Sequence, residues 1–162
     1  MANNSILQAC AETLKKQKLT LAFAESVTAG FLCSAFGALP GCGDFFKGGI
    51  VAYDAEIKKD LLGLTQEMLD KYTPESAEVS KAMVQGLAKL IPADCLVATT
   101  GLNTPGGSET PEKPVGTIFI HIIIKQKEFA IEKYFKGDVA TINEHTLQET
   151  CTLLIDAVTK HA

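Results

Sequence analysis

Arginine is absent from this chain of 162 residues, and all fifteen basic side chains are lysines. Arginine is the usual bidentate partner of phosphate and carboxylate groups, so the chain must bind any such group by other means. An excess of basic residues is also missing. The formal net charge is −4, which argues against nucleic acid and acidic membrane surfaces as partners. No apolar run approaches the about 20 residues that a membrane-spanning helix needs.

The five cysteines are scattered and odd in number, and their spacing matches no metal-binding pattern. We therefore expect free thiols in a reducing compartment. The polar N-terminus lacks the basic-then-apolar order of a signal peptide, which indicates a cytoplasmic protein. The chain length is that of one domain, residues 1–162, with enough residues to bury a core.

The segment 20–30 is the most informative part of the sequence, because a serine stands where a strand is expected to turn into a helix. A short apolar run at residues 19–24 predicts a buried strand, and small residues at 27–38 predict a helix. The Ser26 hydroxyl would lie beside the helix N-terminus, where free N–H groups favour developing negative charge. Two interpretations remain open: Ser26 is a nucleophile, or Ser26 only caps the helix.

A second unusual segment runs from Gly49 to Lys58. A strand is expected at residues 45–53 and a short helix at 55–62, so Tyr53 and Lys58 could face one cleft across the turn between them. The alternative for Lys58, which stands beside Lys59, is a solvated charge on a helix. The alternative for Tyr53 is an aromatic residue at a strand end with its hydroxyl at the surface.

A glycine- and proline-rich stretch at residues 101–116 predicts a long loop, and loops of this length inside a domain are often functional. Around it we expect a strand at 94–100 and a hairpin of strands at 117–124 and 128–135. Gly63 is expected to end the helix at 55–62, Thr65 to cap a short turn and Ser76 to cap a longer helix. A capping box at Thr141 predicts the start of the last helix. Helices that alternate with strands before a hairpin predict an α/β fold, a three-layer α/β/α sandwich around a mixed sheet.

Three segments, taken in order, resemble the CinA C-terminal domain family, the bacterial nicotinamide-nucleotide amidases. They read AESVTAG at 24–30, GGIVAYDAEIK at 48–58, and TGLNTP followed by EKPVGT at 100–105 and 112–117. The family patterns are AESCTGG, GG-x-V-x-YSNEAK, TGIAGP-x-GG and EKPVGT. The resemblance covers nearly the whole chain, and its length suits a stand-alone amidase domain.

The resemblance implies hydrolysis of the carboxamide of nicotinamide mononucleotide to nicotinic acid mononucleotide and ammonia, without metal or cofactor. Ser26 would be the nucleophile, Lys58 the general base, and Tyr53 would relay or orient the proton. The residues expected to bind substrate are Thr28, Gly30, Thr100, Gly101 and Asn103. The expected partners are the small-molecule nucleotide and further copies of the chain, with a dimer favoured.

The chemistry is consistent with these roles. A serine hydroxyl needs activation, and no histidine falls in the three segments. A lysine can act as the base if burial and its neighbours keep the amine neutral. Backbone N–H groups after Ser26 would stabilise the oxyanion.

The chain departs from the family patterns at several positions that would surround a substrate. Val27 replaces a cysteine, Ala55 an asparagine and Asn103 a small residue, while Val139 stands where an arginine is expected to contact substrate. The nucleophile and base remain, but the binding wall changes. The alternative function is that of a catalytically weak or silent relative that binds nucleotides or regulates another process.

Overall fold

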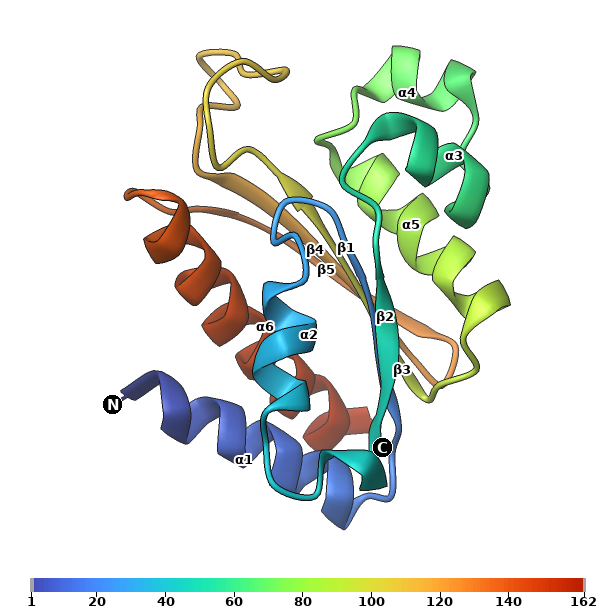
Figure 1. Ribbon diagram of the computed structural model, residues 1–162, viewed down its shortest axis with the longest axis vertical. Helices are drawn as coiled ribbons and strands as arrows, with labels where there is room; N and C mark the ends of the chain where they lie inside the picture. Colours follow the sequence, from blue (N-terminus) through green and yellow to red (C-terminus); the bar gives the residue numbers. More distant parts are fainter. Residues whose placement is uncertain (1, 162) are drawn as a thin grey trace.

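The computed structural model describes residues 2–161, and its centre is one five-stranded sheet with the order β2-β1-β3-β4-β5 (Figure 1). The strands are β1 (Leu21–Glu25), β2 (Phe46–Val51), β3 (Cys95–Gly101), β4 (Thr117–Ile124) and β5 (Lys127–Tyr134). β1 pairs in parallel with β2 and β3, whereas β4 and β5 form an antiparallel hairpin that continues the sheet from β3. The predicted mixed sheet and hairpin are confirmed.

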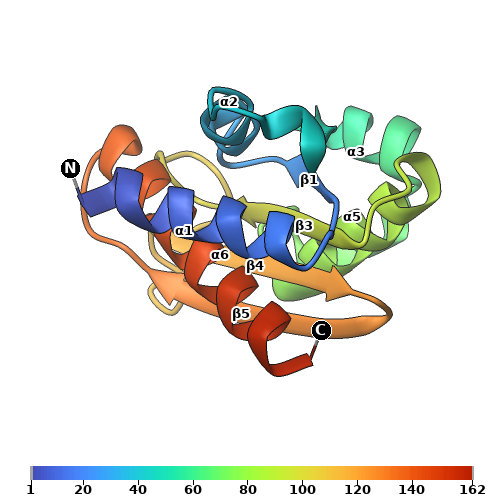
Figure 2. The same cartoon turned by 90° about the horizontal axis from the view of Figure 1, so that it is seen from below.

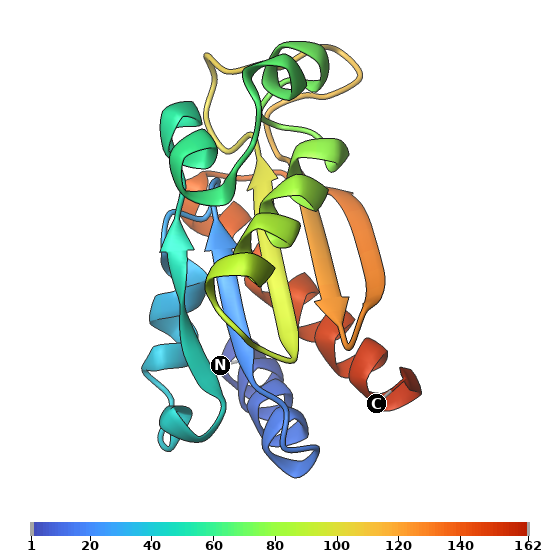
Figure 3. The same cartoon turned by 90° about the vertical axis from the view of Figure 1, so that its right-hand side faces the viewer.

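Helices cover both faces of this sheet. One face carries α1 (Ala2–Lys16), α2 (Phe31–Gly37) and α6 (Val139–His161), and Figure 2 shows α1 and α6 side by side. The other face carries α3 (Ala55–Leu62), α4 (Gln66–Tyr72) and α5 (Ala77–Leu90), with α5 lying along the sheet in Figure 3. A short 3-10 helix, η1 (Cys42–Asp44), precedes β2. The predicted α/β/α sandwich is confirmed.

Within residues 2–161, no helix is both long and apolar enough to cross a membrane.

Small residues bring α3 and α5 close to each other and to the sheet. Ala22 and Ala24 of β1 form the floor beneath this layer, where larger side chains would hold the helices away. Gly86 of α5 lies against the backbone of Leu62, and a Cβ at position 86 would collide with the Leu62 carbonyl group. The face of α3 that carries Lys58 and Leu62 is therefore buried.

Local capping signals were predicted correctly at three points on this side of the sheet. The Thr65 hydroxyl accepts a hydrogen bond from the Met68 N–H group, and the Ser76 hydroxyl accepts one from Val79. Gly63 ends α3 with a positive φ of 72°, a conformation that glycine adopts without strain.

Two predicted helix starts were wrong. The helix expected from Val27 begins at Phe31, because residues 26–30 form a turn in which Ala29 and Gly30 have φ values of 49° and 93°. The capping box expected at Thr141 lies inside α6. The carboxylate of Asp138 accepts the Thr141 N–H group at 2.8 Å, so Asp138 supplies the cap.

The carboxyl ends of the parallel strands meet at one edge of the sheet, which is where open α/β sheets usually bind ligands. Ser26 follows β1, Tyr53 follows β2, and Gly101 ends β3. Three segments that are far apart in the sequence are thus brought to the same place.

Candidate active site around Ser26

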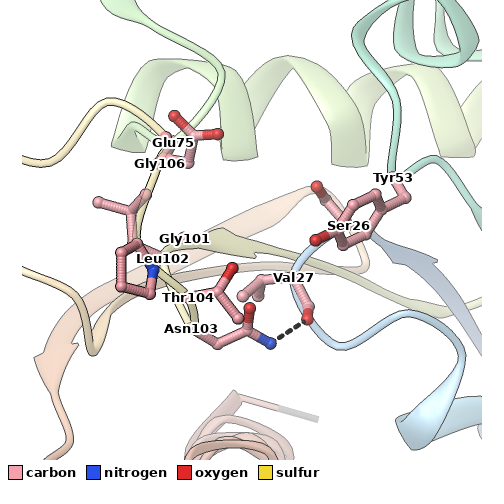
Figure 4. Close-up of a pocket in the computed structure, with 11 residues that line it drawn as sticks. Ser26, Val27, Tyr53, Glu75, Gly101, Leu102, Asn103, Thr104 and Gly106 are labelled. Carbon is pink, nitrogen blue, oxygen red and sulfur yellow. Dashed lines mark hydrogen bonds between the residues drawn. The ribbon is translucent and has the colours of Figure 1, made fainter. Parts of the chain in front are cut away.

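A cavity of about 160 Å³ opens at this edge of the sheet (Figure 4). Its walls are Ser26, Val27, Tyr53, Glu75 and the loop residues 101–107. Pockets that enclose drug-sized ligands typically measure about 300–1,000 Å³. The cavity therefore suits one ring with a small substituent rather than a complete dinucleotide.

Ser26 is fixed by its backbone while its hydroxyl stays unengaged. Its N–H group donates to the Thr99 carbonyl at 2.9 Å, and its carbonyl accepts from the Ala29 N–H group at 3.1 Å. Within the described residues, the Ser26 hydroxyl makes no hydrogen bond to protein, and the side chain borders the cavity. Such a hydroxyl is available to a ligand.

The N-terminus of α2 is capped by Glu25 rather than by Ser26. The Glu25 carboxylate accepts the N–H groups of Gly30, Leu32 and Cys33 at 3.0, 3.1 and 2.7 Å, and the side chain is fully buried. The interpretation of Ser26 as a simple helix cap is therefore wrong, since the Ncap of α2 is Gly30. The positive end of the α2 dipole already faces a carboxylate.

Two other backbone donors lie directly after Ser26. The N–H groups of Val27 and Thr28 have no acceptor in the part of the chain that the structure describes. They belong to the turn before α2, and Val27 lines the cavity. These groups can stabilise an oxyanion that forms on a carbonyl attacked by Ser26.

Lys58 is buried beneath the site, with 1% of its surface exposed. Its ammonium group donates to the Tyr53 carbonyl oxygen at 2.8 Å. Burial lowers the pKa of Lys58, while the carboxylates of Glu75 and Asp54 partly oppose this shift. The alternative of a solvated helix charge is wrong, because α3 packs on α5 along the face that carries Lys58.

Tyr53 has the surface position expected of a strand-end aromatic, and it also borders the cavity. Its side chain is 59% exposed, and Tyr53 lines the same cavity as Ser26 (Figure 4). Lys58 itself is not among the lining residues. The Tyr53 backbone therefore connects the buried amine to the wall that contains Ser26.

The expected substrate-binding residues divide into two groups. Gly101 and Asn103 line the cavity, and the Asn103 amide donates to the Val27 carbonyl at 2.9 Å, which ties the 101–116 loop to the Ser26 turn. The other three are engaged by protein groups outside the lining. Thr28 bonds to the Thr99 hydroxyl, Thr100 donates to the Pro74 carbonyl, and the Gly30 N–H group donates to Glu25.

Three polar residues of the site were missed by sequence reasoning. Glu75 lines the cavity, and its carboxylate accepts a hydrogen bond from the Ser108 hydroxyl. The Lys113 ammonium donates to Ser108 Oγ, to the Glu75 carbonyl and to Thr73 Oγ1, each at 2.8 Å. Lys113 belongs to the EKPVGT segment, so that motif was the available signal for this contact.

The position that departs from the family arginine lies at the start of α6. Val139 is the first residue of α6, is 39% exposed and does not line the Ser26 cavity. Ala55 is the first residue of α3, next to the Asp54 cap. The wall of the cavity therefore carries no cationic side chain.

A model of the CinA C-terminal domain family matches residues 3–158. A CinA-like protein of Thermotoga neapolitana is 45% identical over 129 residues, which are 80% of this chain and 31% of that protein. The chain thus spans about a third of the length of this curated relative.

Two solved structures share the fold. The competence damage-inducible protein A (ComA) of Klebsiella pneumoniae is 24% identical, with a TM-score of 0.93 and 99% of each chain covered. A competence-damaged protein (CinA) superfamily protein of Escherichia coli is 28% identical, with a TM-score of 0.88, and the match covers 94% of this chain and 88% of that one.

Proposed function

This chain belongs to the CinA C-terminal domain family, and we propose that it is an amidohydrolase in which Ser26 attacks the carboxamide of a nicotinamide-type substrate. The observation that carries this proposal is the unengaged Ser26 hydroxyl at the cavity wall, followed by two N–H groups without an acceptor within the described residues. Acyl transfer needs this combination of nucleophile and oxyanion donors. The products with nicotinamide mononucleotide are nicotinic acid mononucleotide and ammonia.

The proposed reaction has two stages. Ser26 Oγ forms a bond to the carboxamide carbon, and its proton passes to the neutral Lys58 amine, which the hydrogen bond to the Tyr53 carbonyl orients. The oxyanion is stabilised by the Val27 and Thr28 N–H groups. Lys58 returns the proton to the leaving nitrogen as the C–N bond breaks and ammonia departs. Water then hydrolyses the acyl-serine ester, which releases the carboxylate product.

The test is ammonia release from nicotinamide mononucleotide by wild type and Ser26→Ala. The variant is expected to lose activity by about 10⁴-fold or more, as removal of a serine nucleophile usually does. Ser34→Ala, at an exposed position of α2, is the matched control and should retain the wild-type rate. Circular dichroism checks that both variants are folded, and a chelator is expected to leave the rate unchanged. Equal rates for wild type and Ser26→Ala would exclude serine catalysis.

A second candidate function follows from the cavity wall. The wall has no cationic side chain that could bind a phosphate group, and it departs from the family pattern at Asn103. A silent relative would bind a nicotinamide compound without releasing ammonia and would act as a binding or regulatory protein. Calorimetric binding without ammonia release by wild type would favour this function.

A further inference from the structure

The Ser26 cavity has an unusual distribution of charge. Glu75 is the one acidic side chain among its eleven lining residues, and these residues include no lysine, arginine or histidine. The wall of the cavity therefore offers a ligand one carboxylate and no cationic side chain.

Two lysines that contact residues of the cavity wall, Lys113 and Lys58, are not available to a ligand. An ammonium group has three N–H donors, and Lys113 directs all three to Thr73 Oγ1, Ser108 Oγ and the Glu75 carbonyl. Lys58 is 1% exposed, donates to the Tyr53 carbonyl and lies outside the lining. Neither can supply the charged contact that a phosphate needs.

The Glu75 carboxylate is held in place by its surroundings. The Ser108 hydroxyl donates to one carboxylate oxygen, and Lys113 holds Ser108 and the Glu75 backbone together. Figure 4 shows Glu75 beside Gly106, apart from Ser26 and Tyr53. A fixed charge of this kind acts on a ligand without first being ordered.

We propose that Glu75 is a specificity-determining residue that selects a cationic substrate, an N-substituted pyridinium carboxamide that needs no phosphate. This inference rests on the proposed function, because it assigns the carboxamide end of the substrate to Ser26. The pyridinium charge is attracted by the Glu75 carboxylate, whereas a phosphate on the same molecule gains no partner in the wall. Opposite charges at a partly screened site favour binding by about ten- to a hundred-fold.

The experiment compares nicotinamide, which is neutral, with 1-methylnicotinamide, which adds a methyl group and a positive charge. Wild type is expected to prefer the cation in kcat/KM by about tenfold or more. Glu75→Gln, which keeps the shape and removes the charge, should reduce that preference about tenfold. The pyridinium is also intrinsically more reactive, but this advantage cancels when the ratio in wild type is divided by the ratio in the variant. Glu112→Gln, at an exposed carboxylate of the 101–116 loop that does not line the cavity, is the matched control.

A second pair of probes tests the phosphate. Nicotinamide riboside should be used at least as well as nicotinamide mononucleotide. A preference of wild type for the nucleotide by several hundred-fold would overturn the proposal.

Calorimetric binding to Ser26→Ala separates this inference from the proposed function. If ammonia is released and the cation preference is the same in wild type and Glu75→Gln, the amidase stands and the role of Glu75 falls. If no ammonia is released, binding still tests the role of Glu75. The Ser26→Ala protein should bind 1-methylnicotinamide more tightly than nicotinamide, and the double variant Ser26→Ala, Glu75→Gln should lose this difference. Equal binding of the two probes, or no binding of the cation, overturns it.

Discussion

At the scale of single residues, neighbouring lysines on α3 have opposite environments. Lys59 is on the solvent side and pairs with Glu56 at 2.7 Å, whereas Lys58 is 1% exposed and donates to the Tyr53 carbonyl. Burial favours the neutral amine and lowers the pKa of Lys58 below its usual 10.5. A larger neutral fraction near neutral pH is what a general base requires.

The Lys58 environment predicts the pH dependence of the reaction. Because the neutral amine is the active form, ammonia release should rise with pH as Lys58 loses its proton, at a pH below 10.5. Lys58→Arg should be nearly as damaging as Lys58→Ala, since a guanidinium group stays protonated. Lys59→Arg is the control and should keep both the rate and its pH profile. A Lys58→Arg protein with robust activity would assign the base to another group.

At the scale of secondary-structure elements, the junction between β1 and α2 depends on one carboxylate. Glu25 ends β1 and accepts three N–H groups at the start of α2 across a turn of five residues. The same turn sets the backbone of Ser26. The cap therefore links the stability of the helix to the position of the proposed nucleophile.

Glu25→Gln should destabilise the fold. The amide side chain keeps one acceptor and replaces the other with a donor that faces N–H groups, and the charge-assisted contacts are lost. We expect a loss on the order of 2–4 kcal/mol in the free energy of unfolding. Urea denaturation followed by circular dichroism measures it, with Glu12→Gln on the exposed side of α1 as the control. A Glu25→Gln protein as stable as this control would contradict the capping role.

Sequence reasoning succeeded where the signal is local. The Thr65 and Ser76 caps and the Gly63 stop depend on residues within one turn, so the end of α3 and the starts of α4 and α5 were predicted closely. It failed at the start of α2, because the Glu25 carboxylate reaches N–H groups five to eight residues ahead and favours a turn with positive φ at Ala29.

The same division holds for the candidate site. Motif resemblance selected Ser26, Tyr53, Gly101 and Asn103, all of which line the cavity. The contact of Glu75 with Ser108 joins residues 33 positions apart, and that of Lys113 with Thr73 joins residues 40 apart. No periodicity or spacing encodes such pairs. Burial of Lys58 likewise arises from α3–α5 packing rather than from its neighbours in sequence.

At the scale of the whole molecule, the two edges of the sheet differ. The outer strand β5 carries charged side chains of both signs, which discourage pairing with another chain: Lys127, Glu128, Glu132 and Lys133. The other outer strand, β2, carries only Lys47. From the end of β2 through α3 the chain carries a group of exposed apolar side chains, Val51, Tyr53, Ile57 and Leu61. Exposed apolar groups of this kind favour a protein interface.

We therefore expect self-association through β2 and α3, as a dimer, which is the commonest soluble assembly. Light scattering at micromolar concentration should give twice the chain mass of 17.3 kDa. Leu61→Glu places a charge among the exposed apolar side chains and should yield a monomer. Leu90→Glu, at a residue of similar exposure that ends α5, is the control and should remain a dimer, because it lies outside that group. Tyr53 belongs both to the apolar group and to the Ser26 cavity, so the monomeric variant should also change KM. A wild-type monomer, or a Leu61→Glu protein that is still dimeric, would show that this surface is not the interface.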